Sequence, residues 1–412
     1  MAQFRSRLIS VCATAVAVVS TVSPALPVQA ISITAAVPAA SSGTAALSVT
    51  AGSGVVCAAL KGGTAKCWGA IDQGDGARHG YAPNTMGDLL SPLELGYGRT
   101  VKSTVTGRNR ACALLDNGAV KCFGWNYFGN LGYGDTADRG DDVGEMGDDL
   151  FPVSLGTARR ARAISGMAFH TCALLDNGSV KCWGYNYRGQ LGIGDTMDRG
   201  DNPDEMGDAL PVVSLGKGRR AKAVSAGGLH TCALLDNGTV KCWGYNLYGV
   251  LGLVFTDIAS AIRGDAAGEM GDALPPVNLG RGRKAKAVSA GAEHTCALLD
   301  NGTVKCWGRN TWGQLGYGDT RNRGLLSGDM GDNLPAVKLG TGRKAKAISA
   351  GWTHTCAVLD NGTVKCWGAG NFGQLGQGNA TDVGDSADEM GDALQAIDLG
   401  PGRKAKAVSA GD

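Results

Sequence analysis

The stretch His294–Gly308, with the sequence HTCALLDNGTVKCWG, has two short apolar segments on either side of Asp300-Asn301-Gly302. Asn-Gly between apolar and β-branched residues is the strongest short-range signal for a β-hairpin. If the loop is these three residues, with the glycine in the left-handed conformation, Cys296 faces Cys306. Directly opposed strand residues lie at a Cα separation that a disulfide can span. The stretch therefore predicts a hairpin closed by a disulfide.

The same pattern recurs along the chain. The first cysteines of the pairs fall at positions 57, 112, 172, 232, 296 and 356, so the steps are 55, 60, 60, 64 and 60 residues. The first copy is degraded, with Lys61-Gly62-Gly63 at the turn and no His-Thr before the cysteine. A repeat of this size indicates a propeller or a solenoid. The predicted disulfide pairs are Cys57–Cys67, Cys112–Cys122, Cys172–Cys182, Cys232–Cys242, Cys296–Cys306 and Cys356–Cys366.

The first thirty residues have the features of a secretory signal. Two arginines precede an apolar run, Leu8–Val22, which is short for a membrane span, and a small-residue cleavage site ends at Ala30. We therefore expect residues 1–30 to be a signal peptide, 31–45 a flexible leader and 46–412 the repeat domain. No later stretch is long and apolar enough for a membrane helix, so the expected location is secreted or cell surface.

Export determines the chemistry expected of the cysteines. Of the 13 cysteines, Cys12 lies in the predicted signal and the others form the six pairs. In an oxidising compartment such pairs form disulfides, each worth roughly 2–3 kcal/mol for a short loop. The rival interpretation, a zinc site, does not suit the wide cysteine spacing within one hairpin.

The charge balance and the glycine content narrow the fold and the partners. The 39 Lys and Arg, less the two in the predicted signal, equal the 37 Asp and Glu, whereas a general nucleic-acid binder is usually basic. The 66 glycines favour many short strands and turns over long helices. We therefore expect an all-β protein without a nucleic-acid partner.

Each repeat contains four strand candidates, the number found in a propeller blade. In the fifth repeat these are Ala285–Ala290, the two strands of the cysteine hairpin, and Leu334–Leu339, where Pro335 suits an edge strand. A long acidic loop joins the third and fourth strands, and a basic corner such as Arg343-Lys344-Ala345-Lys346 leads into the next unit. Because these connections leave an up-and-down blade at opposite ends, we expect one acidic and one basic face.

The units resemble regulator of chromosome condensation repeats. The signature is carried by Gly351-Trp352-Thr353-His354-Thr355, by Trp367-Gly368 and by Asn371-Phe372-Gly373-Gln374-Leu375-Gly376, and it covers about residues 46 to 411. The resemblance implies a β-propeller of four-stranded antiparallel blades, seven in the family. The paired cysteines make the chain similar to the secreted bacterial version, and its architecture is similar to that of the propeller-type β-lactamase inhibitory protein.

The number of blades is six if each hairpin founds one blade. A further strand candidate, Ala405–Ala410, follows the sixth unit without another cysteine pair. In a six-bladed ring this strand would compete with Leu47–Ala51 for one place. A ring with an incomplete seventh blade is the alternative.

The repeated histidines and aromatic residues are expected to be structural. Each histidine sits at the same place in its own unit, which predicts hydrogen bonds to turns rather than a shared metal or catalytic site. The histidines are His170, His230, His294 and His354. The tryptophan of each Cys-Trp-Gly (Phe123 in the second unit) is expected in the core between blades. A plant ultraviolet photoreceptor shares the repeat family, which implies clustered tryptophans and arginines, but only Trp352 precedes an x-His-Thr run here.

The acidic loops are the candidates for an ion site, because calcium binds carboxylate and carbonyl oxygens on flexible loops. In the third unit the candidate ligands are Asp195, Asp198, Asp201, Asp204, Glu205 and Asp208. Their spacing fits no EF-hand, and a solvated loop is the alternative. The sequence has no Ser/His/Asp arrangement, no unpaired nucleophilic cysteine and no phosphate-binding Gly-Lys-Ser/Thr motif. We therefore expect no enzyme activity and no cofactor other than calcium.

These patterns favour a monomeric, secreted recognition scaffold that binds an extracellular protein or glycan through its blade loops; inhibition of an enzyme is one specific version. The loop after Leu251 is longer than its equivalents and carries the candidate contact residues Val254, Phe255 and Ile258. One alternative is guanine-nucleotide exchange on a small GTPase, which the resemblance implies and which requires an intracellular protein. The other is a structural component of an envelope or matrix.

Overall fold

Every predicted cysteine hairpin is present in the computed structural model, which describes residues 17–20, 46–75, 78–82, 84–254 and 261–411. In the fifth hairpin Cys296 lies opposite Cys306 in the ladder, and their Cα atoms are 4.1 Å apart across the disulfide. Gly302 has a φ of 84°, as the tight turn requires. The other five predicted disulfides form in the same way.

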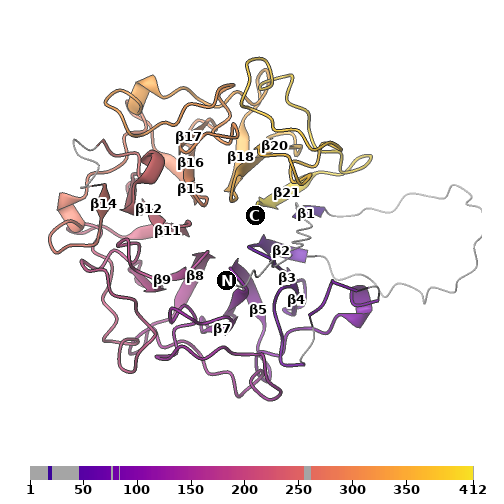
Figure 1. The fold of residues 1–412 in the computed structure, drawn as a ribbon, viewed down its shortest axis with the longest axis vertical. Coiled ribbons are helices and arrows are strands. Elements are labelled where there is room, and N and C mark those ends of the chain that lie inside the picture. Colours follow the sequence, from indigo (N-terminus) through magenta and orange to yellow (C-terminus); the bar gives the residue numbers. More distant parts are fainter. Residues whose placement is uncertain (1–16, 21–45, 76–77, 83, 255–260, 412) are drawn as a thin grey trace, which may run out of the picture.

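The hairpins belong to six antiparallel sheets that follow one another around a central axis (Figure 1). The inner strand of each sheet precedes its hairpin, and we number the sheets blades 1 to 6. Blade 1 consists of β2 (Ala46–Ala51), β3 (Val55–Leu60) and β4 (Ala65–Gly69), and blade 2 of β5 (Val101–Gly107), β6 (Arg110–Leu115) and β7 (Val120–Gly124). Blade 3 consists of β8 (Ala161–Met167), β9 (His170–Leu175) and β10 (Val180–Gly184), and blade 4 of β11 (Ala221–Ala226), β12 (His230–Leu235), β13 (Val240–Tyr245) and β14 (Ile262–Arg263). Blade 5 consists of β15 (Ala285–Ala290), β16 (His294–Leu299) and β17 (Val304–Gly308), and blade 6 of β18 (Ala345–Ala350), β19 (His354–Leu359) and β20 (Val364–Gly368). The six-bladed propeller predicted from the hairpins is confirmed.

The fourth strand of each blade is shorter than predicted and lies in the long loop after the hairpin, not in the predicted segment. Among the described residues only blade 4 has a fourth strand longer than one bridge, β14, which pairs with β13. In four other blades an isolated bridge takes its place, for example Gly308 with Arg323. The segment predicted as the fourth strand, Leu334–Leu339, contributes a single ladder-like bond from the Val337 N–H to the Val304 carbonyl. Its proline and the short 3-10 helices that precede such segments interrupt regular pairing. The 3-10 helices are η1 (Gly87–Leu89), η2 (Leu247–Gly249), η4 (Gly271–Ala273) and η5 (Gly331–Asn333).

β21 (Ala405–Ser409) lies at a seventh position around the axis, and no other repeat strand of the described residues shares its sheet. This strand does not compete with β2 for one place, because the two are neighbours and the Ala51 N–H donates to the Ser409 hydroxyl at 3.3 Å. The outer edge of β21 pairs with β1 (Ala17–Ser20), in antiparallel register. No helix in the described part of the chain is long and apolar enough to cross a membrane.

Large aromatic side chains fill the spaces between blades, as predicted. Trp183, Trp243, Trp307 and Trp367 are fully buried, as is Phe123 in blade 2. Each packs in the hydrophobic cluster of the preceding blade, so that Trp367, for example, lies with residues of blade 5. The indole N–H of Trp243 also donates to the Gln190 carbonyl at 3.0 Å. Blades 2 to 6 therefore each bury an aromatic side chain against the preceding blade.

A polar relay crosses the same interfaces and explains the repeated histidines. The Thr231 hydroxyl donates to the Gln190 carbonyl at 2.8 Å, so its oxygen must accept from the ring Nε2 of His170, 2.8 Å away. The same relay links His230 to Thr295 and His294 to Thr355. Each of these histidines therefore carries a proton on Nε2, and burial, which lowers the pKa of each to about 3, keeps the ring neutral. The predicted structural role is confirmed for these three, but the partner of each is a threonine of the next blade rather than a turn.

Arg110 replaces the histidine in blade 2. Its guanidinium is fully buried and donates to the Thr171 hydroxyl and to the His170 carbonyl, each at 2.7 Å. No carboxylate pairs with it among the described residues, and burial lowers the pKa of Arg110 to about 10. A buried cation without a counter-ion destabilises the folded state.

The predicted separation of charge between two faces is wrong in one respect. The end of each long acidic loop returns to the basic corners, where Asp208 accepts from the Thr157 N–H at 2.9 Å. Equivalent bonds join Asp148, Asp272, Asp332 and Asp392 to other corners. Corner arginines also pair with hairpin aspartates, such as Arg159 with Asp176 at 3.1 Å. Carboxylates therefore lie on the basic face as well, because the loops are long enough to cross the blade.

We predict that Arg110→His stabilises the protein. The imidazole can make the same bond to Thr171 that the other blades use, without a buried charge, and we expect the free energy of unfolding to rise by about 1 kcal/mol. Urea titration at neutral pH measures this change. Arg110→Ala is the control and should destabilise, because it leaves a cavity and removes the donors to the Thr171 hydroxyl oxygen and the His170 carbonyl. Equal stability of Arg110→His and Arg110→Ala would contradict the interpretation.

We also predict that stability falls on acidification. Burial lowers the pKa of His170, His230 and His294 to about 3 and that of His354 to about 4. Because the folded pKa lies below the unfolded value near 6.5, their contribution is complete above that pH and is lost as pH falls toward the folded pKa. Each histidine contributes a slope of up to about 1.4 kcal/mol per pH unit. The raised pKa of Asp201, about 6, and the raised pKa values of Asp198 and Asp265 act in the opposite sense, against the four histidines.

Urea midpoints measured between about pH 7.5 and 4.5 test this slope. His294→Gln is the matched variant, because its amide can still donate to the Thr355 hydroxyl while it cannot titrate. We expect a shallower dependence in that variant, and an unchanged one would refute the histidine origin.

Candidate interaction surface

The residues proposed from the sequence as partner contacts lie on the longest loop of blade 4. Val254 is 49% exposed. Phe255 and Ile258 lie outside the described residues. This loop ends at β14, which pairs with β13 and returns the chain to the blade. The structure therefore brings one of the three predicted contacts to the surface and leaves the other two untested.

The acidic candidates for calcium are engaged by protein donors. Asp195 forms an ion pair with Arg199 at 2.6 Å, Asp198 accepts from the Asn186 N–H at 2.7 Å, and Glu205 accepts from the Gly200 N–H at 2.9 Å. Asp208 is bound at the basic corner, and Asp204 has a positive φ of 66°. No group of three or more acidic, histidine or cysteine side chains in the described ranges is arranged to hold a metal ion. These side chains shape the loop.

Of these candidate ligands Asp201 has the largest shift in pKa; the pKa of Asp198 is also raised and that of Asp208 is lowered. The pKa of Asp201 is raised to about 6, first by burial and then by the nearby Glu205 carboxylate. Its Oδ1 is buried without a hydrogen-bond partner. In blade 4, burial and the neighbouring Glu269, through its hydrogen bond and its charge, raise the pKa of Asp265. These carboxylates pack beneath the turn of the preceding blade, where a side chain at Gly129 would overlap the backbone of Asp201.

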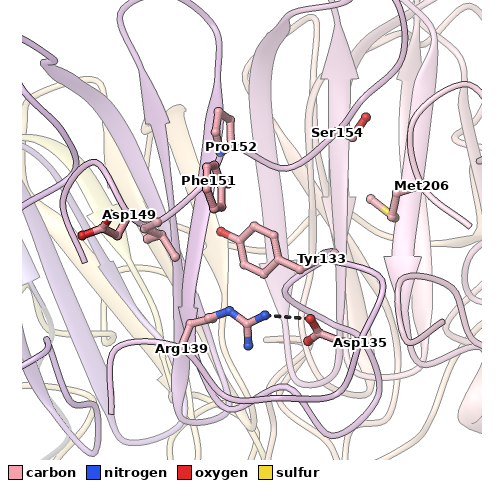
Figure 2. A pocket seen from close by; sticks show the side chains of 10 residues that line it. Tyr133, Asp135, Arg139, Asp149, Phe151, Pro152, Ser154 and Met206 are labelled. Carbon is pink, nitrogen blue, oxygen red and sulfur yellow. Dashed lines mark hydrogen bonds and ion pairs between the residues drawn. The ribbon is translucent and has the colours of Figure 1, made fainter. Parts of the chain in front are cut away.

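A hollow of about 280 Å³ opens on the rim between blades 2 and 3 (Figure 2). Its polar groups bind one another: Arg139 pairs with Asp135 at 2.7 Å and its guanidinium lies 5.5 Å from the centre of the Tyr133 ring. The Tyr133 hydroxyl donates to the Cys122 carbonyl. Ser154 also lines the hollow, but no histidine or cysteine does. The lining therefore provides no activated nucleophile.

The most distinctive surface is a cluster of aromatic rings across blades 2 and 3. Trp125 and Tyr127 follow β7 and are stacked at 5.7 Å with an angle of 12° between planes. In the next blade, Tyr185 and Tyr187 follow β10 and are stacked at 6.4 Å and 23°. Phe128 joins the two pairs, with its ring centre 4.6 Å from that of Tyr185. Phe169, from the turn before β9, packs edge-on against Phe128 at 5.5 Å.

Arginines extend this cluster around the ring. Arg188 lies between the rings of Tyr187 and Tyr245, at 5.0 and 4.5 Å. Arg108 lies over Phe169, and neither Arg108 nor Arg188 takes part in an ion pair within the described residues. Farther on, Arg309 lies over Tyr248 and pairs with Glu293. We call this set the aromatic–arginine surface: Arg108, Trp125, Tyr127, Phe128, Phe169, Tyr185, Tyr187, Arg188, Tyr245, Tyr248 and Arg309.

The surface is exposed where a partner would need it. Tyr127 and Tyr187 are 65% and 61% exposed, while Trp125, Phe128 and Tyr185 are half-buried beneath them. Burial and the neighbouring Asp198 raise the pKa of Tyr185, so its hydroxyl stays neutral. This surface was not predicted from the sequence. The signal was available, because aromatic residues recur within four positions after the Trp-Gly or Phe-Gly in units 2 to 4.

These features define a β-propeller of disulfide-stapled repeats that presents an aromatic and cationic surface on one end of its blades. A family model for the RCC1-like domain matches residues 25–412. The chain therefore belongs to the RCC1-like domain family, as the resemblance implied.

Among curated relatives, the chain is 31% identical to the ultraviolet-B receptor UVR8 of Arabidopsis thaliana, over 82% of this chain and 68% of UVR8. It spans only 5% of another relative, the human E3 ubiquitin-protein ligase HERC2, at 29% identity over 67% of this chain. The structure is similar to human WBSCR16, with a TM-score of 0.65, 17% identity, and coverage of 89% of this chain and 85% of that one. It is also similar to Prp20p of Saccharomyces cerevisiae, with a TM-score of 0.62, 19% identity, and coverage of 85% and 76%. These structural likenesses support the fold.

Proposed function

We propose that this protein is an exported recognition propeller without catalytic activity that binds a protein partner through the aromatic–arginine surface. The observation that carries the proposal is the surface itself. Tyr, Trp and Arg are enriched among the residues that dominate the binding energy of protein interfaces. Exposed Tyr127 and Tyr187 rest on half-buried rings, so they lose little conformational freedom when a partner packs on them. A protein partner rather than a glycan is supported by solved relatives, since Prp20 is described with Kap60, and with Gsp1p and histones.

Export is supported by the six disulfides and the predicted signal peptide. Every cysteine in the described blades is paired, and such bonds persist in oxidising compartments. The alternative of nucleotide exchange on a small GTPase would place the same twelve cysteines in the reducing cytosol, where they would stay as thiols. The alternative of a structural envelope or matrix component predicts self-association rather than one saturable partner.

We predict that the exported protein has lost residues 1–30 and contains six disulfides. Intact mass after alkylation should show no modified cysteine before reduction and twelve after it. The same protein retained in the cytosol provides the matched control. Twelve free thiols on a chain with its leader uncleaved would contradict the proposal and favour the exchange-factor alternative.

We further predict that Tyr127→Ala with Tyr187→Ala weakens partner binding at least about tenfold without loss of stability. The partner is captured from the exported proteins of the source cells with immobilised wild-type protein, and its affinity is then measured with each variant. Tyr97→Ala, at a basic corner and 95% exposed, is the control. Equal affinity of the double variant and the wild type would place the interface elsewhere.

A further inference from the structure

The inner strand of every blade begins with a β-bulge. In blade 5, Ala285 faces Leu299 and Ala287 faces Leu298 across the ladder, so that Lys286 is the extra residue and has no partner there. The other five blades show the same shift of register at the same place. A bulge bends its strand and re-aims the extra side chain. Each blade therefore directs one side chain out of its sheet at the start of the inner strand.

The extra residue of the bulge is a cation in blades 2 to 6, and β21 carries a lysine at the same place in its repeat. All of these side chains are exposed, and none takes part in an ion pair within the described ranges. Because the inner strands follow one another around the axis (Figure 1), the cations surround the axis at one end of the propeller. We call this set the cationic ring: Lys102, Arg162, Lys222, Lys286, Lys346 and Lys406.

A further set of cations lies at the same end, over the hairpin turns. A Cβ built on Gly302, in the turn of blade 5, would lie 2.9 Å from the Cβ of Lys344, so the stem of this lysine crosses the turn. Four other turns are crossed in the same way. These turn cations are exposed and form no ion pair among the described residues. They are Arg160, Arg220, Lys284, Lys344 and Lys404.

The carboxylates at this end are already balanced by other cations. The hairpin aspartates pair with corner arginines, for example Asp300 with Arg283 at 3.2 Å. The aspartates that bind the corners lie beside buried lysines. Lys305 is one of these: its Nζ donates to the Gly331 carbonyl at 2.7 Å, and Asp332 stabilises its charge, although burial lowers the pKa of the lysine. The cationic ring and the turn cations are therefore an excess of positive charge.

The cationic ring and the aromatic–arginine surface lie at opposite ends of the inner strands. In blade 2, Lys102 is the second residue of β5, whereas Arg108 follows its last residue. At about 3.3 Å per residue, the six steps between them correspond to about 20 Å. A partner bound at one end therefore leaves the other end free.

Two exposed side chains of apolar character accompany the cations. Leu47 is the extra residue of the bulge in blade 1 and is 57% exposed. Tyr97 lies at the basic corner between blades 1 and 2 and is 95% exposed. A tyrosine ring suits the boundary between membrane and water because it is apolar with a polar tip. Cations with exposed apolar side chains among them are typical of surfaces that lie in the headgroup region of a bilayer.

We propose that the cationic end of the propeller binds the surface of a bilayer that contains anionic phospholipids, and that it thereby presents the aromatic–arginine surface away from the membrane. Equivalent positions in successive blades are related by rotation about one axis, so the cations of the ring lie close to one plane. A planar anionic surface meets all of them at once, whereas a linear polyanion reaches only part of the ring. Each lysine or arginine held near such a surface adds to the attraction.

Vesicles test the proposal on the exported protein, which on the export proposed above lacks the apolar run of residues 8–22. The protein is sedimented with vesicles of phosphatidylglycerol and phosphatidylcholine in equal parts, and with vesicles of phosphatidylcholine alone. We expect binding to the anionic vesicles only. Raising the salt from about 0.1 M to about 1 M shortens the screening length from about 10 Å to about 3 Å and should weaken this binding at least about tenfold. Equal binding to the two kinds of vesicle would overturn the proposal.

The combined variant Lys222→Gln, Lys286→Gln and Lys346→Gln removes three charges of the ring and should weaken binding to the anionic vesicles at least about tenfold. The matched control is Lys222→Arg, Lys286→Arg and Lys346→Arg, which retains the charge at the same positions and should bind like the wild type. Wild-type binding by the glutamine variant would overturn the proposal.

Heparin serves as the linear polyanion for comparison. We expect it to bind the protein more weakly than the anionic vesicles do. Tighter binding of heparin, lost in the glutamine variant, would assign the cationic end to a linear polyanion and overturn the proposal. None of these assays involves the aromatic–arginine surface, so their failure leaves the proposed function standing.

Discussion

A threonine hydroxyl joins each of blades 3 to 6 to the blade before it, and the arrangement of these blades depends on that interaction. Thr231 contacts two groups of the blade before it, the ring Nε2 of His170 and the carbonyl of Gln190. Because one hydroxyl must both accept and donate, the distance and the angle between blades are fixed together. The histidine donates from Nε2 in this arrangement, and a second proton on the Nδ1 of His170, which is buried without a partner, would have no acceptor. The relay thus links the geometry of the ring to the protonation state of its core.

The disulfides do not provide this link. Each one closes a hairpin within a single blade, with the two cysteines ten residues apart. It therefore restricts the conformations of the unfolded hairpin, but it joins no blade to the next. The aromatic side chains that cross the interfaces contribute buried area without direction. Where Arg110 replaces the histidine, the bond to the threonine is retained at the cost of a buried charge. The retention of that one bond, by a side chain poorly suited to burial, shows which contact the interface requires.

Local patterns predicted what is local in this fold. The turn at Gly302, the pairing of Cys296 with Cys306 and the number of hairpins all follow from residues close in sequence. The short fourth strands could not be predicted, because Pro335 signals an edge but not how little of that edge is paired. The aromatic–arginine surface was missed because Phe128 and Tyr185 belong to different units and become neighbours only when the ring forms. The charge pattern failed for the same reason, since Asp208 reaches a corner that lies 51 residues away in sequence.

The inner strands connect blades 6 and 1 without the histidine–threonine relay. Among the described residues no threonine bonds to His354, and Ile397 and Leu399 on the fourth segment of blade 6 are half-buried. The strands at the axis are nevertheless continuous, because the Ala410 N–H donates to the Ser349 hydroxyl and the Ala51 N–H donates to the Ser409 hydroxyl. Contacts at the axis and contacts between hairpins are therefore separable in this fold, and only the contacts between hairpins depend on the protonation state of a buried histidine.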